Sequence, residues 1–111
     1  MTFIARDVIL QAVHASAPLL PLIRKHDRDL HDQVRRALQS AALNAGESAY
    51  SDDGNRRARL FTAAGSANEA RCALQLAVAF GYVGATEAAN ADALLDRSLA
   101  LLWRLTRGRR R

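Results

Sequence analysis

The residue type with the clearest binding chemistry in this sequence is arginine, which is gathered into two groups. All but Lys25 of the 16 lysine and arginine residues are arginine, and the larger group ends the chain. Its members, with no acidic residue among them, are Arg104, Arg107, Arg109, Arg110 and Arg111. Because the planar guanidinium group forms paired hydrogen bonds with phosphates and carboxylates, this group is a candidate element for binding RNA or DNA. A genome rich in G and C would produce the same preference for arginine without a functional cause.

The second group consists of Arg56, Arg57 and Arg59, directly after a predicted turn. No aromatic residue lies between the arginines of either group, so we expect binding to be electrostatic and sequence-tolerant, without base stacking. The alternative for the C-terminal group is a disordered, solubilising end. If the chain binds no nucleic acid, the competing interpretation is a protein-interaction scaffold or adaptor. An enzyme of an unfamiliar kind is a third alternative.

Polar residues also recur beside the apolar positions of two predicted helices. The set consists of Arg36, Ser40, Asn44, Glu47, Ser66 and Glu69. If the turn between the helices centres near residue 53, the facing pairs are Glu47 with Arg59, Ser40 with Ser66, and Arg36 with Glu69. We therefore predict two ion pairs on either side of a serine layer. We interpret this layer as structural, because partly buried polar groups need partners and often specify how helices align.

Metal and nucleophile chemistry is not indicated by the spacing of the remaining polar residues. Carboxylate-bridged metal bundles use Glu-x-x-His, and no glutamate here is followed by histidine at that distance. His14, His26 and His31 share no ligand spacing, so we expect surface or packing roles for them. Cys72 is expected to be a buried, unreactive thiol. We predict no catalytic residues, no metal and no cofactor, and hence a protein that is not an enzyme.

Three interruptions divide the 111 residues into four helical stretches. They are Pro18 and Pro21, the turn-forming residues 51–55, and the glycines at 81 and 84. The predicted helices span about 2–17 with a restart through 23, then 28–50, 56–80 and 86–105. Short connections make neighbouring helices antiparallel. The predicted fold is an all-α, antiparallel up-and-down four-helix bundle at residues 1–106, with its first helix kinked or broken near Pro18 and Pro21, and a basic tail at 107–111.

Helix ends and packing faces follow from the same pattern. Asn55 and Thr86 are predicted N-caps, and Gly81 suits the left-handed position after a helix. Apolar residues recur at helical spacing at Leu30, Val34, Ala37, Leu38, Ala41, Ala45, Leu60, Ala64, Ala67, Leu74, Val78, Leu95, Leu99, Leu102 and Leu105. Small residues between 63 and 70, Gly65 among them, should let the third helix approach the second closely.

Apolar residues in the last helix exceed a single stripe. Leu94, Leu101 and Trp103 lie beside it, and such a surplus is typical of an oligomer interface. The alternative is that Trp103 closes the end of the core.

A set of residues between 30 and 82 carries a family resemblance. They are Leu30, Gln33, Arg36-Ala37, Ser40, Asn44, Glu47, Ala63, Gly65-Ser66, Glu69, Leu74, Ala77 and Gly81-Tyr82. In them the chain resembles the four-helix-bundle family of proteins encoded in intervening sequences of 23S ribosomal RNA genes. Where the family usually reads Asn-Ile-Ala-Glu-Gly, this chain keeps Asn44 and Glu47 but has Ser48 in place of the glycine.

The resemblance implies a homopentameric barrel of four-helix protomers, from a family with no established catalytic activity. The chain is also similar to the accessory protein of diversity-generating retroelements, which implies a basic surface that binds nucleic acid and a reverse transcriptase.

The expected location is the cytoplasm. Cys72 is the only cysteine, so the chain forms no internal disulfide, which fits a reducing compartment. A signal peptide is the weaker alternative, because Asp7 and Gln11 interrupt the apolar run 8–10 and Pro18 follows the possible cleavage site. No stretch approaches the ~18 apolar residues of a membrane span.

Overall fold

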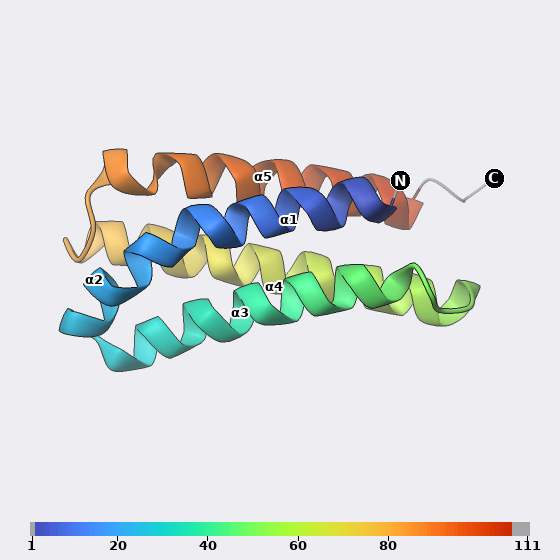
Figure 1. Cartoon of the computed structure of the whole chain (residues 1–111), viewed down its shortest axis with the longest axis horizontal. Helices are drawn as coiled ribbons and strands as arrows, with labels where there is room; N and C mark the ends of the chain where they lie inside the picture. Colours follow the sequence, from blue (N-terminus) through green and yellow to red (C-terminus); the bar gives the residue numbers. More distant parts are fainter. Residues whose placement is uncertain (1, 108–111) are drawn as a thin grey trace.

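The chain folds into helices only, over the residues that the structure describes. The structure is a computed structural model that describes residues 2–107, with side chains from residue 4 onward (Figure 1). The elements are α1 (Thr2–Ser16), η1 (Ala17–Leu19), α2 (Leu20–His26), α3 (Arg28–Ser48), α4 (Asp53–Ala79) and α5 (Ala85–Arg107).

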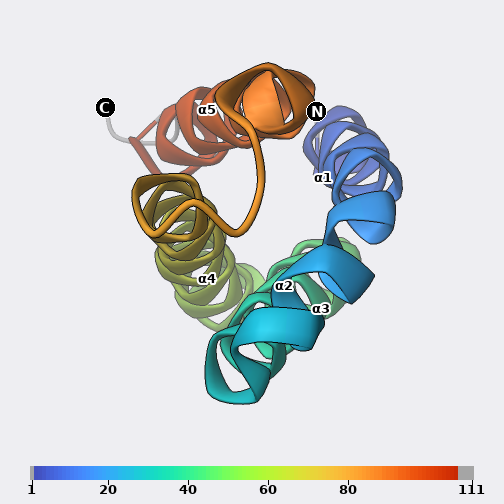
Figure 2. The same cartoon turned by 90° about the vertical axis from the view of Figure 1, so that its left-hand side faces the viewer.

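Four long helices form an antiparallel bundle, which confirms the predicted fold class. Viewed end on, α1, α3, α4 and α5 surround one core, and α2 crosses from α1 to α3 at one end (Figure 2). The bundle is a rod with extents of 45 × 21 × 18 Å. The start of α4 and the end of α5 lie at the same end of this rod (Figure 1).

The first helical segment is interrupted where the prolines predicted it. After Ser16 the chain makes the 3-10 turn η1 and then restarts as α2, with Pro18 and Pro21 in the opening positions of these two segments. Proline lacks a backbone N–H, and the first positions of a helix need none. The segment therefore stays helical but changes direction.

Helix starts differ from the prediction at two places. The N-cap of α4 is Asp52, whose carboxylate accepts a hydrogen bond from the Asn55 backbone at 3.0 Å, so the prediction of Asn55 as the cap was wrong. Thr86 is not a cap either, because α5 already begins at Ala85. There the Glu87 carboxylate reaches back and accepts from the Gly84 N–H at 2.8 Å, as in half of a capping box.

The end of α4 has the predicted glycine geometry. Gly81 has φ +82°, and its N–H donates to the Val78 carbonyl while the Tyr82 N–H donates to the Ala77 carbonyl, both at 2.9 Å. This is the Schellman arrangement, which pairs carbonyls that the helix itself leaves open. It turns the chain sharply toward α5.

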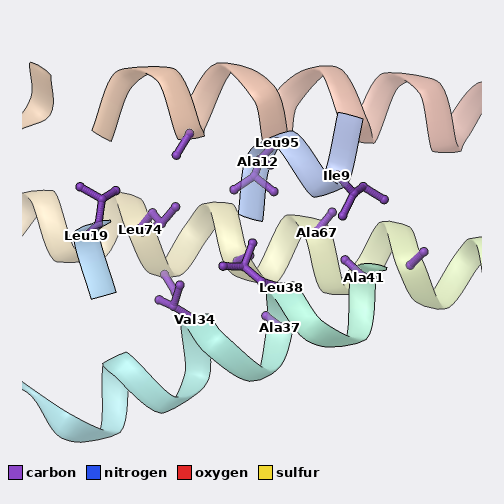
Figure 3. Close-up of a cluster of buried hydrophobic side chains, with 14 of the residues drawn as sticks. Ile9, Ala12, Leu19, Val34, Ala37, Leu38, Ala41, Ala67, Leu74 and Leu95 are labelled. Carbon is purple, nitrogen blue, oxygen red and sulfur yellow. The ribbon is translucent and has the colours of Figure 1, made fainter. Parts of the chain in front are cut away.

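The core is filled by the predicted apolar stripes, together with residues of α1 and α2. Their side chains meet between the helices (Figure 3). Ala63, Ala64, Ala67 and Ala70 of α4 are completely buried, and α4 shares its most extensive packing with α3. Gly65 departs from the prediction, because it lies on the exposed side of α4.

No helix within residues 2–107 has the length and apolar character needed to cross a membrane.

Candidate nucleic-acid interface

The predicted hairpin register brings two of the three facing pairs together. The hydroxyl oxygens of Ser40 and Ser66 lie 2.7 Å apart, and Asn44 Nδ2 donates to the Ser40 carbonyl at 2.9 Å. Two turns nearer the loop than the serine pair, a guanidinium nitrogen of Arg59 lies 2.6 Å from Glu47 Oε1. Polar side chains therefore cross from α3 to α4 beside the alanine contacts, which orients the two helices.

The third predicted pair is not formed. Among the described residues, Arg36 and Glu69 make no ion pair within 4.0 Å, and both side chains are exposed. Arg36 instead lies close enough to Asp32, one turn earlier on α3, to help lower the pKa of that carboxyl. The main cause of the lowered pKa is the hydrogen bond from His31 at 2.8 Å. A partner on its own helix thus competes with the predicted partner on α4.

The best-connected polar cluster joins α4 to α5, and the sequence reasoning missed it. Arg71 Nε and Nη2 donate to the two carboxylate oxygens of Asp92 at 2.9 and 3.2 Å. Arg71 Nη1 donates to Asp96 at 2.9 Å, and Gln75 donates to Asp92 at 3.1 Å. The hydrogen bonds that Asp92 accepts, first from Arg71 and then from Gln75, lower the pKa of its carboxyl. The signal in the sequence was the one-turn spacing of both pairs, Arg71 with Gln75 and Asp92 with Asp96.

The two predicted arginine groups meet at one end of the rod. Arg56 and Arg57 lie in the first turns of α4, and Arg104 and Arg107 lie in the last turns of α5. A pocket of ≈ 240 Å³ between these segments is lined by Asp53, Arg56, Arg57, Leu105 and Thr106. Arg57, Arg104 and Arg107 are exposed. Two segments far apart in the chain thus place arginines at the same end of the rod, which we call the arginine end (Figure 1).

The other predicted arginines are placed differently. Arg59 points to Glu47 in the ion pair described above, so it belongs to the α3–α4 contact. Arg109, Arg110 and Arg111 lie outside the described residues.

Aromatic side chains adjoin the arginine end, contrary to the expectation from the linear sequence. Phe61 of α4 and Trp103 of α5 are 43% and 38% exposed, and their ring centroids lie 5.7 Å apart at an interplanar angle of 65°. The guanidinium carbon of Arg57 lies 5.5 Å from the centre of the Phe61 ring. Arg57 therefore contacts an aromatic ring in space, although no aromatic residue lies between the arginines along the chain.

A second basic cluster was not singled out from the sequence. Arg24, Lys25, Arg28 and His31 line an open cavity of ≈ 590 Å³ where α2 meets α3. This cluster lies at the opposite end of the rod from the arginine end (Figure 1). Substitutions in this cluster remove the same charge as substitutions at the arginine end, so they serve as a control for the effect of net charge on binding.

The groups with redox or metal-binding chemistry are dispersed. Cys72 is exposed, so the prediction of a buried thiol was wrong; it lies next to the buried stripe of Ala70, Ala73 and Leu74 but faces away from it. Within residues 2–107, no three His, Cys, Asp or Glu side chains are grouped so as to hold a metal ion. His14 is exposed and His26 stacks on Tyr82 with ring centroids 5.2 Å apart.

The apolar surplus of the last helix is mostly absorbed within the chain. Leu94 and Leu101 are half-buried against the core, and Trp103 contacts Phe61. More exposed leucines occur elsewhere, at 49% for Leu10 and 55% for Leu43. These two line an apolar groove of ≈ 330 Å³ between α1 and α3.

Fold and surface together define the class of this protein, an all-α four-helix bundle with an arginine end. Comparison of the chain with protein-family models, with curated proteins and with solved structures finds no match in any of the three.

Proposed function

We propose that this chain is a non-enzymatic, oligomeric four-helix bundle that binds RNA or DNA through its arginine end. The observation that carries the proposal is that the first turns of α4, with Arg56 and Arg57, and the last turns of α5, with Arg104 and Arg107, lie at the same end of the rod. Asp53 is the one acidic side chain that lines the pocket between them. The lone Cys72 supports a reducing, cytoplasmic setting.

Clustered guanidinium groups bind nucleic acid mainly by releasing counterions from the phosphates. Each neutralised phosphate adds about 0.9 to the slope of log affinity against log salt for duplex DNA, and about 0.7 for single strands. Such binding requires no base contacts, so affinity depends on salt more than on sequence.

Assembly strengthens the binding that the arginine end can provide. One protomer offers only a few phosphate contacts, whereas linked sites gain about 100-fold or more in affinity without a new type of contact. The resemblance to the intervening-sequence family supports a ring of protomers, with five as the proposed number.

The test compares two double variants that remove the same charge from opposite ends of the rod. Arg104→Gln with Arg107→Gln is expected to weaken binding of a fluorescent RNA and to reduce the salt slope, as measured by fluorescence anisotropy. Arg24→Gln with Lys25→Gln is the control and is expected to change both little. Equal losses in the two variants would mean that net charge, and not the arginine end, determines binding.

The basic tail is tested separately by deleting residues 107–111. The truncated protein is expected to bind random RNA and DNA more weakly, with a flatter salt dependence, while helicity by circular dichroism and assembly size stay unchanged. If the truncated protein and the full chain give identical salt titrations, the tail does not bind nucleic acid and acts only as a solubilising end.

A second candidate function is a protein-interaction scaffold, and the apolar groove between α1 and α3 favours it. Leu10, Leu38 and Leu43 line this groove, whose surface is almost entirely apolar. If neither the full chain nor its variants bind RNA or DNA at low salt, the scaffold is the better interpretation.

A further inference from the structure

The exposed aromatic pair beside the arginine end is not explained by the packing of the bundle. Leu60 and Leu102, the residues next to Phe61 and Trp103, are completely buried, whereas both aromatic rings stay more than one third exposed. We call Phe61, Trp103 and the adjoining Arg57 the aromatic patch.

The two rings of the patch do not stack face to face. At an interplanar angle of 65°, the two rings meet edge to face, so each keeps at least one face that the other does not cover. The Arg57 guanidinium lies over one face of the Phe61 ring, which leaves the other face and Trp103 for a ligand, and Arg104 follows Trp103 directly in the chain. A flat aromatic group joined to a negative charge would be complementary to such a surface, because the ring can stack while the charge meets the arginines.

We infer that the aromatic patch binds unpaired bases of single-stranded RNA or DNA by stacking on Phe61 and Trp103, while Arg57, Arg104 and Arg107 contact the phosphates. This inference rests on the proposed function and specifies its ligand. In a duplex the faces of the bases are covered by their neighbours, so a duplex can use the arginines but not the rings. The patch thus distinguishes single strands from duplexes without reading sequence.

The chain contains a direct reporter for this inference, because Trp103 is its only tryptophan. Titration of the full chain with an unlabelled oligothymidylate of about 15 nucleotides is expected to quench Trp103 fluorescence with saturation. A duplex of the same length, at the same salt, is expected to bind without comparable quenching. Equal quenching by both, or binding of the single strand without quenching, would overturn the stacking while leaving the proposed function intact.

A variant pair separates stacking from charge. Phe61→Leu keeps every arginine and is expected to weaken single-strand binding about five- to a hundred-fold, with an unchanged salt slope and unchanged duplex binding. Phe80→Leu is the control, because Phe80 is 58% exposed at the opposite end of α4 and is expected to change nothing. Unaltered single-strand affinity in Phe61→Leu overturns the inference.

Two further outcomes have distinct meanings. If the wild-type chain binds neither single strands nor duplexes, the inference and the proposed function fail together. If Phe61→Leu lowers the assembly mass by light scattering and no oligonucleotide quenches Trp103, the patch is a contact between copies of the chain, and the inference is overturned.

Discussion

The hydroxyl groups of Ser40 and Ser66 form a hydrogen bond of 2.7 Å between α3 and α4, at the level where alanines bring the two helices together. Asn44 Nδ2 also approaches the Ser40 hydroxyl at 3.3 Å, so Ser40 has two partners and Ser66 has one. The pair therefore belongs to a small network, and its contribution is measurable only as a coupling.

A double-mutant cycle on this pair is the first prediction. Ser→Ala raises helix propensity by up to ~0.5 kcal/mol, which opposes the loss of the hydrogen bond and makes each single value misleading. We expect a coupling free energy of about 0.5 to 1 kcal/mol between Ser40→Ala and Ser66→Ala, from urea unfolding followed by circular dichroism. Strict additivity of the two substitutions would show that the bond does not stabilise the hairpin.

The Arg71 cluster leads to a second prediction, because its geometry depends on the guanidinium fork. Arg71→Lys keeps the positive charge but cannot bridge both oxygens of Asp92 and also reach Asp96. We expect a loss of about 1 kcal/mol, a modest value because the side chain of Asp96 is two-thirds exposed. For a domain of this size that loss lowers the melting temperature by about 4 to 8 °C.

Arg97→Lys on the exposed side of α5 is the control for this substitution. An equal decrease in melting temperature in both variants would assign the effect to lysine itself rather than to the lost fork.

The lowered pKa of Asp92 makes a third prediction, about acid. A carboxyl whose pKa is lower in the folded than in the unfolded state stabilises the fold. This stabilisation is complete at pH values well above the ordinary pKa of 3.8. That contribution disappears as the pH falls through the folded-state pKa, below about pH 4. Asp92→Asn should therefore be less stable than wild type at pH 7, and the difference in unfolding free energy should shrink between pH 4 and pH 2. A difference that stays constant over this range would contradict the linkage.

The fourth prediction concerns assembly. The structure makes an exposed leucine of α3, rather than the leucines of α5, the best position for a substitution that tests it. Leu94 and Leu101 pack within the protomer, whereas Leu43 is 55% exposed beside the α1–α3 groove. We expect the wild-type chain to exceed its protomer mass of 12.1 kDa in multi-angle light scattering, and Leu43→Glu to reduce the mass toward that value. Leu76→Glu, at a leucine 45% exposed on α4, is the control. A wild-type monomer at micromolar concentration would contradict the proposed assembly.

The sequence was sufficient for the helices and for one hairpin register, for identifiable physical reasons. Apolar residues at helical spacing identify the core-facing side of a helix without knowledge of the helices that pack against it. Stripes such as Leu30 to Ala45 were therefore predictable. A short turn fixes which residues face each other, which is why Ser40 and Ser66 were paired correctly. The failure of Arg36 with Glu69 reflects long, exposed side chains, for which a partner one turn away on the same helix is as good.

Contacts between α4 and α5 were harder to predict than those between α3 and α4. Phe61 and Trp103 belong to different helices, and their meeting depends on the register of α4 with α5. The sharp turn at Gly81 sets that register, and the spacing of residues within either helix does not reveal it. The contact of Arg71 with Asp92 depends on the same register. The turn between α3 and α4 allowed facing residues to be paired from the sequence. The same pairing across the turn between α4 and α5 would predict both contacts.

The alanine-lined contact between α3 and α4 also has a kinetic consequence. Residues 49–52 alone connect the two helices, so bringing them together closes a short loop at a small cost in chain entropy. Alanine loses no rotamer freedom when it is buried. The α3–α4 hairpin should therefore form early and serve as the folding nucleus, and α1, η1 and α2 should dock onto it late. Substitutions in that late-docking segment are expected to accelerate unfolding while leaving the folding rate nearly unchanged.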